Sequence, residues 1–112
     1  MVENNIPVKF ALFNNRYLGM VRQWQDIFYD KSYVATYYTH NPDFVKLAEA
    51  FGLFGTRVTT EEEVIPAIKA AMDHPGPALI DFIVAQEENV YPMIPAGTST
   101  DELIEEPHES KE

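Results

Sequence analysis

Cysteine is absent from this chain of 112 residues, which excludes disulfides, a cysteine-ligated zinc site and a thiol nucleophile. Long hydrophobic runs are lacking as well, since no stretch approaches the roughly 20 apolar residues that a membrane span needs. No basic segment followed by an apolar run marks a signal peptide after Met1. The sequence therefore favours a cytoplasmic protein.

Basic residues are few: the chain has 8 lysines and arginines but 18 aspartates and glutamates, which gives a formal net charge of −10. A field of that sign repels DNA, RNA and anionic membranes, so neither a nucleic acid nor a membrane is an expected partner. The acidic excess gathers near the C-terminal end, where Lys111 is the only basic residue. We predict residues 98–112 to be an acidic, disordered tail and residues 1–97 to be the folded unit.

The chain does contain a globular share of apolar residues, 46%, arranged in short runs and helical stripes. The apolar runs predict buried strands at residues 8–13, 55–59 and 78–84. Apolar residues three and four apart predict helices at residues 18–29, 42–51 and 61–73. Strands that alternate with helices indicate an α/β fold, here a three-layer arrangement of a mostly parallel sheet with flanking helices.

Local signals add detail to these elements. Asn41 is placed to cap the second helix, with Pro42 at its first position and Gly52 ending it in a left-handed conformation. Pro66 conflicts with the third helix, so we expect a kink or a later start there. Asp81 interrupts the last strand, and because a buried carboxylate needs partners, we expect a hydrogen-bonded structural role for it.

Two asparagines, Asn14 and Asn15, directly follow the first predicted strand and precede a helix. In open α/β sheets ligands bind at the carboxyl ends of the strands, and the first N–H groups of a helix are unpaired. That setting suits an anion held by a hard cation such as Mg²⁺, for which an amide oxygen is a suitable ligand. On its own, an asparagine pair is more typical of a turn.

Three blocks of sequence make the pair more specific. They are NNRYLGMVRQWQ at residues 14–25, NPDFVKLAEA at 41–50 and ENVYPMIPAG at 88–97. Together they resemble the catalytic large subunit of acetolactate synthase, also called acetohydroxyacid synthase. The resemblance covers nearly the whole chain, and the stretch from Gly19 to Gln25 is its most specific part.

The resemblance implies a transferase that joins two 2-oxo acids with loss of CO₂ in branched-chain amino acid biosynthesis. It implies thiamine diphosphate and Mg²⁺ as cofactors. Asn15 matches the family's side-chain metal ligand, and Tyr17 matches the residue whose backbone carbonyl binds the same ion. Gly19 and Met20 match positions close to the cofactor, and the match assigns no catalytic residue to this segment.

Four apolar residues of the first helix match family positions around the substrate channel: Met20, Val21, Trp24 and Phe28. Judged from the spacing alone, the alternative is ordinary packing, because a Met, Trp and Phe stripe at helical spacing is usually part of a core. The resemblance favours the channel, especially for Trp24.

The chain also departs from the family. The first half of the cofactor motif, Gly-Asp-Gly, occurs nowhere in it. Absent too are the domain that supplies the activating glutamate and the domain that holds FAD in most relatives. We therefore expect a truncated portion, the C-terminal part of a thiamine-diphosphate-binding domain, inactive by itself and without bound FAD. Lacking neighbouring strands, residues 8–13 should leave an apolar edge that self-associates or binds other thiamine-diphosphate enzyme chains.

Two other interpretations stay open. The chain is alternatively a non-catalytic interaction module that binds or modulates a full-length thiamine-diphosphate enzyme subunit through its exposed sheet. Oxidases and decarboxylases that use the same cofactor share the scaffold, although the block around Trp24 favours acetolactate synthase.

Overall fold

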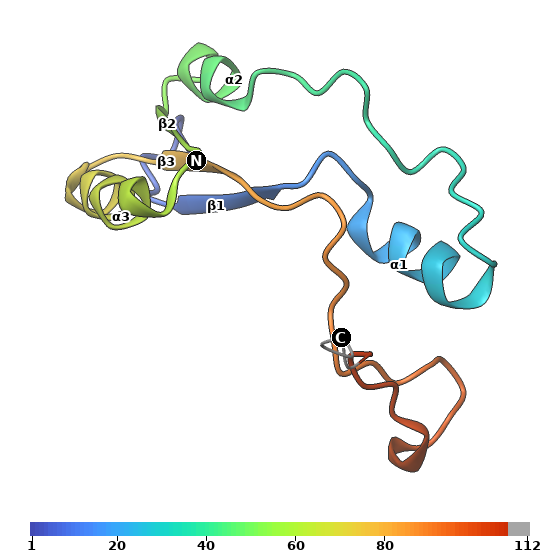
Figure 1. The fold of residues 1–112 in the computed structure, drawn as a ribbon. Helices are drawn as coiled ribbons and strands as arrows, with labels where there is room; N and C mark the ends of the chain where they lie inside the picture. Colours follow the sequence, from blue (N-terminus) through green and yellow to red (C-terminus); the bar gives the residue numbers. More distant parts are fainter. Residues whose placement is uncertain (108–112) are drawn as a thin grey trace.

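A three-stranded parallel sheet organises the chain, whose computed structural model describes residues 1–107 (Figure 1). The strands are β1 (Lys9–Asn14), β2 (Phe54–Val58) and β3 (Ala78–Ile83), in the order β1-β3-β2. Asn14 pairs in register with Ile83 at the carboxyl edge. The predicted parallel sheet is confirmed, with each strand within about two residues of its expected bounds.

Helices cover both faces of the sheet. Helix α2 (Phe44–Ala50) and helix α3 (Val64–Asp73) lie on opposite sides in Figure 1, and each contacts β2 and β3. This placement follows from right-handed crossovers, because the chain moves across the sheet in one direction from β1 to β2 and in the other from β2 to β3. The three-layer α/β architecture expected from the sequence is therefore confirmed.

The apolar core is small. Its buried apolar side chains are alanines and two β-branched residues of β2, β3 and the helices: Ala48, Val58, Ala67, Ala71, Ala78 and Ile80. The largest side chain with essentially no exposure is that of Asp81. A polar side chain thus occupies a fully shielded position in the sheet.

Much of the apolar surface has no cover from the described residues. The Cα radius of gyration is 17.8 Å, against about 13 Å for a compact chain of this length. Strand β1 pairs only with β3, and Phe13 at its end is 71% exposed. Helix α1 (Gly19–Phe28) stands away from the sheet in Figure 1. The expected unpaired apolar edge is present.

Helix α2 begins two residues later than predicted. Its N-cap is Asp43, whose Oδ1 accepts from the backbone N–H groups of Val45 at 3.2 Å and Lys46 at 3.3 Å. The prediction of Asn41 as the cap is wrong, because the helix begins at Phe44 and Asn41 lies two residues before the cap position. The Asn41 side chain is oriented toward β1, where its Nδ2 donates to Asn14 Oδ1 at 2.9 Å. The end of the helix is as expected, with Gly52 at φ +77°.

The third predicted helix divides in two. A 3-10 turn spans Glu61–Glu63, and α3 follows from Val64. Pro66 then lies in the first turn of α3, where a missing N–H costs no hydrogen bond. The later start expected from Pro66 is confirmed.

Beyond β3 the chain runs on with little regular structure. Residues 98–107, within the predicted acidic tail, contain a 3-10 turn at Thr100–Glu102 and a bridge in which Ile104 pairs with Met93. The boundary at residue 98 stays a prediction, and the part of the predicted tail at residues 108–112 lies outside the described residues. Among residues 1–107, no helix is long and apolar enough to cross a membrane.

The positive φ of Gly52 leads to a stability prediction. Gly52→Ala should lower the free energy of unfolding by about 1 kcal/mol, because a Cβ is disfavoured in the left-handed region. The added Cβ would meet Val2 only at 3.8 Å, so the cost is conformational and not steric. Gly52→Asn should cost less, since Asn adopts this conformation more readily. Urea unfolding followed by circular dichroism measures both, and equal losses for the two variants would contradict the backbone explanation.

Candidate functional site

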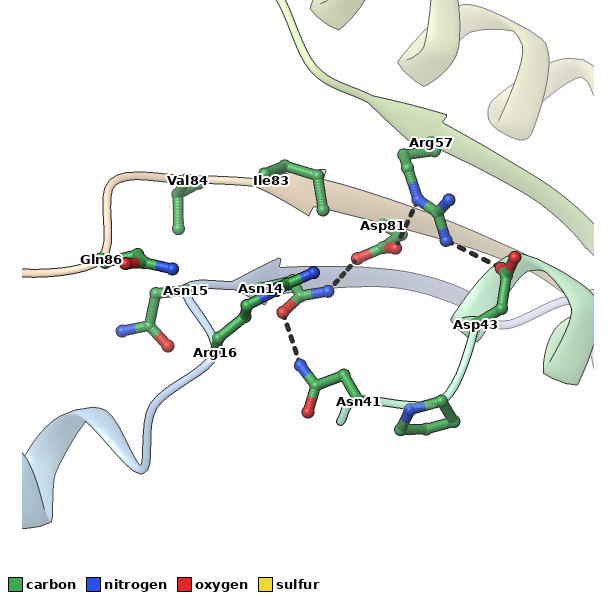
Figure 2. A pocket seen from close by; sticks show the side chains of 11 residues that line it. Asn14, Asn15, Arg16, Asn41, Asp43, Arg57, Asp81, Ile83, Val84 and Gln86 are labelled. Carbon is green, nitrogen blue, oxygen red and sulfur yellow. Dashed lines mark hydrogen bonds and ion pairs between the residues drawn. The ribbon is translucent and has the colours of Figure 1, made fainter. Parts of the chain in front are cut away.

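Polar side chains line an open cavity of about 520 Å³ at the carboxyl edge of the sheet (Figure 2). They come from the end of β1, the segment before α2, and strands β2 and β3. The polar lining comprises Asn14, Asn15, Arg16, Asn41, Asp43, Arg57, Asp81 and Gln86. The cavity lies where ligands bind in parallel α/β sheets, as the sequence predicts.

A hydrogen-bond network centred on Asp81 forms the floor of this cavity. The fully buried Asp81 carboxylate accepts from Asn14 Nδ2 at 3.0 Å and from Arg57 Nε at 2.9 Å. Arg57 Nη2 also donates to Asp43 Oδ1 at 2.7 Å, and Asn41 Nδ2 donates to Asn14 Oδ1 at 2.9 Å. Figure 2 shows the four contacts as one continuous network across the sheet. The structural role predicted for Asp81 is confirmed.

The network sets the charge of the cavity floor. The hydrogen bond to Asp81 raises the pKa of Arg57, and that to Asp43 adds to the effect. The pKa of Asp43 is lowered, mainly by the backbone N–H of Lys46 and also by Arg57. Arg57 thus stays charged but shared between two carboxylates, which leaves it little capacity to neutralise a bound anion.

Asn15 is separate from this network. In Figure 2 its side chain points away from the Asn14 and Asp81 cluster. Its Oδ1 accepts from the N–H of Tyr17 at 3.0 Å, and its Nδ2 lies on the Gly19 side, 3.4 Å from where a Cβ on Gly19 would stand. An amide oxygen has two lone pairs, so Asn15 Oδ1 keeps the capacity to bind a cation.

The predicted ligand residues therefore lie together in one short turn. Asn14 is held across the sheet by hydrogen bonds at both ends of its amide, to Asp81 and to Asn41. Asn15 instead accepts one hydrogen bond, from within its own turn. The carbonyl of Tyr17 accepts no backbone hydrogen bond within residues 1–107. Two neutral oxygens suit Mg²⁺, but they are few for an octahedral ion. Among residues 1–107, no group of three or more His, Asp or Glu side chains is arranged to hold a metal.

The predicted channel residues form a different surface. Met20, Val21 and Trp24 line a groove of about 420 Å³ along α1, and Phe28 packs edge-on against Trp24, with ring centroids 5.8 Å apart. Met20 is 60% exposed and Trp24 is 39% exposed. Packing in a core made by residues 1–107 is therefore excluded for this stripe. The structure also leaves Met20 outside the lining of the polar cavity.

Sequence reasoning missed Arg57, Asp43 and Gln23. Arg57 is a charged residue within a short strand, a signal that points to a buried partner such as Asp81. Asp43 follows Asn41 and Pro42, which offered a competing cap. Gln23 sits among apolar residues on α1, and nothing in the local sequence shows that the polar side of that helix is the buried one.

Comparisons with known proteins agree on one family. Residues 1–82 match the family described as thiamine pyrophosphate enzyme, C-terminal TPP binding domain. The acetolactate synthase of Mycobacterium bovis is 52% identical over 103 residues, 88% of this chain and 17% of that protein. The acetolactate synthase isozyme 2 large subunit of Escherichia coli is 41% identical over 100 residues, 89% of this chain and 18% of that protein.

A solved structure supports the same fold. The Rhodococcus jostii RHA1 thiamine diphosphate-dependent 4-hydroxybenzoylformate decarboxylase superposes with a TM-score of 0.67 at 29% identity. The match covers 80% of this chain and 16% of that one. The chain thus spans less than a fifth of the length of the relatives and of the solved structure that it matches.

Removing the Arg57 guanidinium tests the Asp81 network. Arg57→Met should lower the free energy of unfolding by about 3–5 kcal/mol, because it leaves a buried carboxylate without its cationic partner. The double variant Arg57→Met, Asp81→Asn should recover part of that loss, since the uncompensated charge is gone. Arg16→Met is the matched control, because Arg16 is an exposed arginine that lines the same cavity. Urea unfolding measures all three, and equal losses for Arg57→Met and Arg16→Met would contradict the network.

Asp43 predicts a pH dependence. Because its folded pKa lies below the ordinary value of 3.8, its contribution to stability is present above that value and is lost as the pH falls through the folded pKa. Asp43→Asn keeps a capping oxygen but cannot titrate. Between about pH 5 and pH 3 the variant should therefore lose less stability than the parent chain. Thermal unfolding at stepped pH measures this, and parallel curves for the two proteins would count against the prediction.

Proposed function

The chain belongs to the thiamine pyrophosphate enzyme family through its C-terminal TPP binding domain, and on that premise we propose that it supplies part of the cofactor site of an acetolactate synthase. When bound, thiamine diphosphate supplies the electron sink that lets one 2-oxo acid lose CO₂ and join a second. The proposed place of the reaction is branched-chain amino acid biosynthesis in the cytoplasm.

The observation that carries the proposal is the difference between two neighbouring asparagines. Asn14 is committed to Asp81 and Asn41, whereas Asn15 and the Tyr17 carbonyl present oxygens beside the first turn of α1. Asn15 and Tyr17 would hold Mg²⁺, with Gly19 and Met20 beside the cofactor. The free N–H groups at the start of α1 add a favourable field for the diphosphate.

A second proposed role belongs to the groove on α1. Met20, Val21 and Trp24 line it and Phe28 supports Trp24. We propose that these side chains form a wall of the channel through which the 2-oxo acids reach the cofactor. Their exposure agrees with a surface that is completed by other parts of the enzyme.

The proposed partner is a chain that supplies the rest of the enzyme. Two oxygens do not complete an octahedral site, so the diphosphate, water or other parts of the enzyme would supply the remaining ligands. The free edge of β1 and its exposed apolar residues provide the surface for that association. We expect the isolated chain to be inactive, and FAD, where the enzyme has it, to be bound outside residues 1–97.

Complementation tests this function. A large subunit such as the Mycobacterium bovis relative, shortened by the segment that aligns with this chain, should form acetolactate from pyruvate only when this chain is added with thiamine diphosphate and Mg²⁺. Asn15→Ala should raise the Mg²⁺ concentration needed for half-maximal activity about 10-fold or more. Asn4→Ala, at an exposed asparagine outside the site, is the matched control.

The outcomes separate the hypotheses. An unchanged Mg²⁺ requirement in Asn15→Ala would remove Asn15 from the metal site. Tight association with the shortened subunit and no activity at saturating cofactor would favour the alternative, a non-catalytic interaction module.

A further inference from the structure

Helix α1 buries its polar side and exposes its apolar side. Gln23 is 2% exposed and Arg22 is 6% exposed, whereas Met20 and Trp24 on the same helix face outward. In Figure 1 the helix stands off the sheet, and the segment after β3 runs past it. On the groove side, Gln25 joins α1 to Val34 and Thr36 in the segment that follows the helix. The contacts of α1 with the segment after β3 lie on its polar side.

Gln23 provides the most specific of these contacts. Its Nε2 donates to the carbonyl of Val90 at 2.8 Å, and its Oε1 accepts from the N–H of Val90 at 2.9 Å. The side-chain amide thus pairs with the backbone of a residue 67 positions away, satisfying both groups as a strand partner would. Gln23 Nε2 also lies 3.3 Å from Met93 Sδ.

Further contacts join the same two segments. Asn89 Nδ2 donates to Asp26 Oδ2 at 2.7 Å. The other oxygen of Asp26 accepts from the hydroxyl of Tyr33, in the segment that directly follows α1. Arg22 lies 3.8 Å from a carboxylate oxygen of Glu87. Residues 87–93 therefore form a strap along the polar side of α1. The hydrogen bonds between Gln23 of the helix and Val90 of the strap lie at the centre of this contact.

We propose that Gln23 is a positioning residue, through which the strap of residues 87–93 fixes the rotation of α1 and hence the direction in which Trp24 faces. The contacts of Asp26 with Asn89 and of Gln25 with Val34 are single hydrogen bonds, each of which tolerates some rotation of the helix about its axis. The two opposed bonds of one amide to one peptide group define a plane, so rotation of α1 breaks both. The direction of the groove of Met20, Val21 and Trp24 follows, because these side chains project from the helix whose polar side is held at Val90.

The role of Gln23 in fixing the rotation of α1 does not depend on the proposed function. Only its consequence for substrate binding rests on that function, through the assignment of the groove as a channel wall. The two parts have different readouts, so the failure of one is distinguishable from the failure of the other.

Trp24 makes the positional part measurable, because it is the chain's single tryptophan. Gln23→Ala should shift Trp24 emission to the red and increase its quenching by acrylamide. Loss of two hydrogen bonds should also lower amide exchange protection in α1 about 10-fold or more. Protection in β3 should stay as in the parent chain, because the Asp81 network is untouched.

Two further variants keep the test decisive. Gln23→Glu preserves the shape but removes the donor to the Val90 carbonyl, so it should behave like Gln23→Ala. Glu88→Gln changes an exposed strap residue and should leave Trp24 emission unchanged. Unchanged emission and α1 protection in Gln23→Ala would overturn the proposal. An equal loss of protection in β3 and α1 would overturn it too, because Gln23 would then support the whole fold.

In the complemented enzyme, Gln23→Ala should raise KM for the 2-oxo acid while the Mg²⁺ requirement stays as in the parent. A simultaneous rise in the Mg²⁺ requirement would contradict a role confined to the groove. If complementation yields no activity, the proposed function fails while the fluorescence and exchange results still decide the role of Gln23.

Discussion

The buried carboxylate of Asp81 is the constraint on which the sheet edge depends. A charge at that depth is tolerated only with close partners, and it has two, Arg57 from β2 and Asn14 from β1. Arg57 in turn reaches Asp43, the cap of α2. One buried carboxylate therefore ties three strands and the start of a helix into a fixed geometry. The apolar core around it is built largely from alanines and short aliphatic residues.

That fixed edge contrasts with the rest of the chain, which is open. Apolar side chains on β1 and α1 remain exposed, and the radius of gyration exceeds that of a compact chain of equal length. Both facts agree with a match to less than a fifth of each relative. The polar network needs no other chain to form, whereas the apolar surfaces gain their stability only when something covers them.

Patterns with a local cause were readable from the sequence. The three strands, the three helices, the left-handed Gly52 and the late start of α3 at Val64 follow from periodicity and backbone sterics. The acetolactate synthase resemblance is confirmed by relatives at 41–52% identity. Features that depend on contacts with distant residues could not be predicted from the sequence. Asp43 is the cap of a helix that begins two residues later than predicted, and it is also bonded to Arg57 of β2. Helix α1 has its polar side buried, and Gln23 on that side bonds to the distant Val90.

Asn14 and Asn15 are identical neighbours in the sequence, but their side chains have different hydrogen-bond partners. The buried Asp81 needs hydrogen-bond donors, and Asn14 is the residue of β1 that donates to it, so the Asn14 side chain has a structural role. The chain then turns at Arg16, which has φ +61°, and this turn brings the start of α1 next to Asn15. The sheet thus sets where the predicted ligand stands, while the strap on Gln23 sets how the neighbouring groove faces. Since the two supports share no side chain, loss of one should leave the other in place.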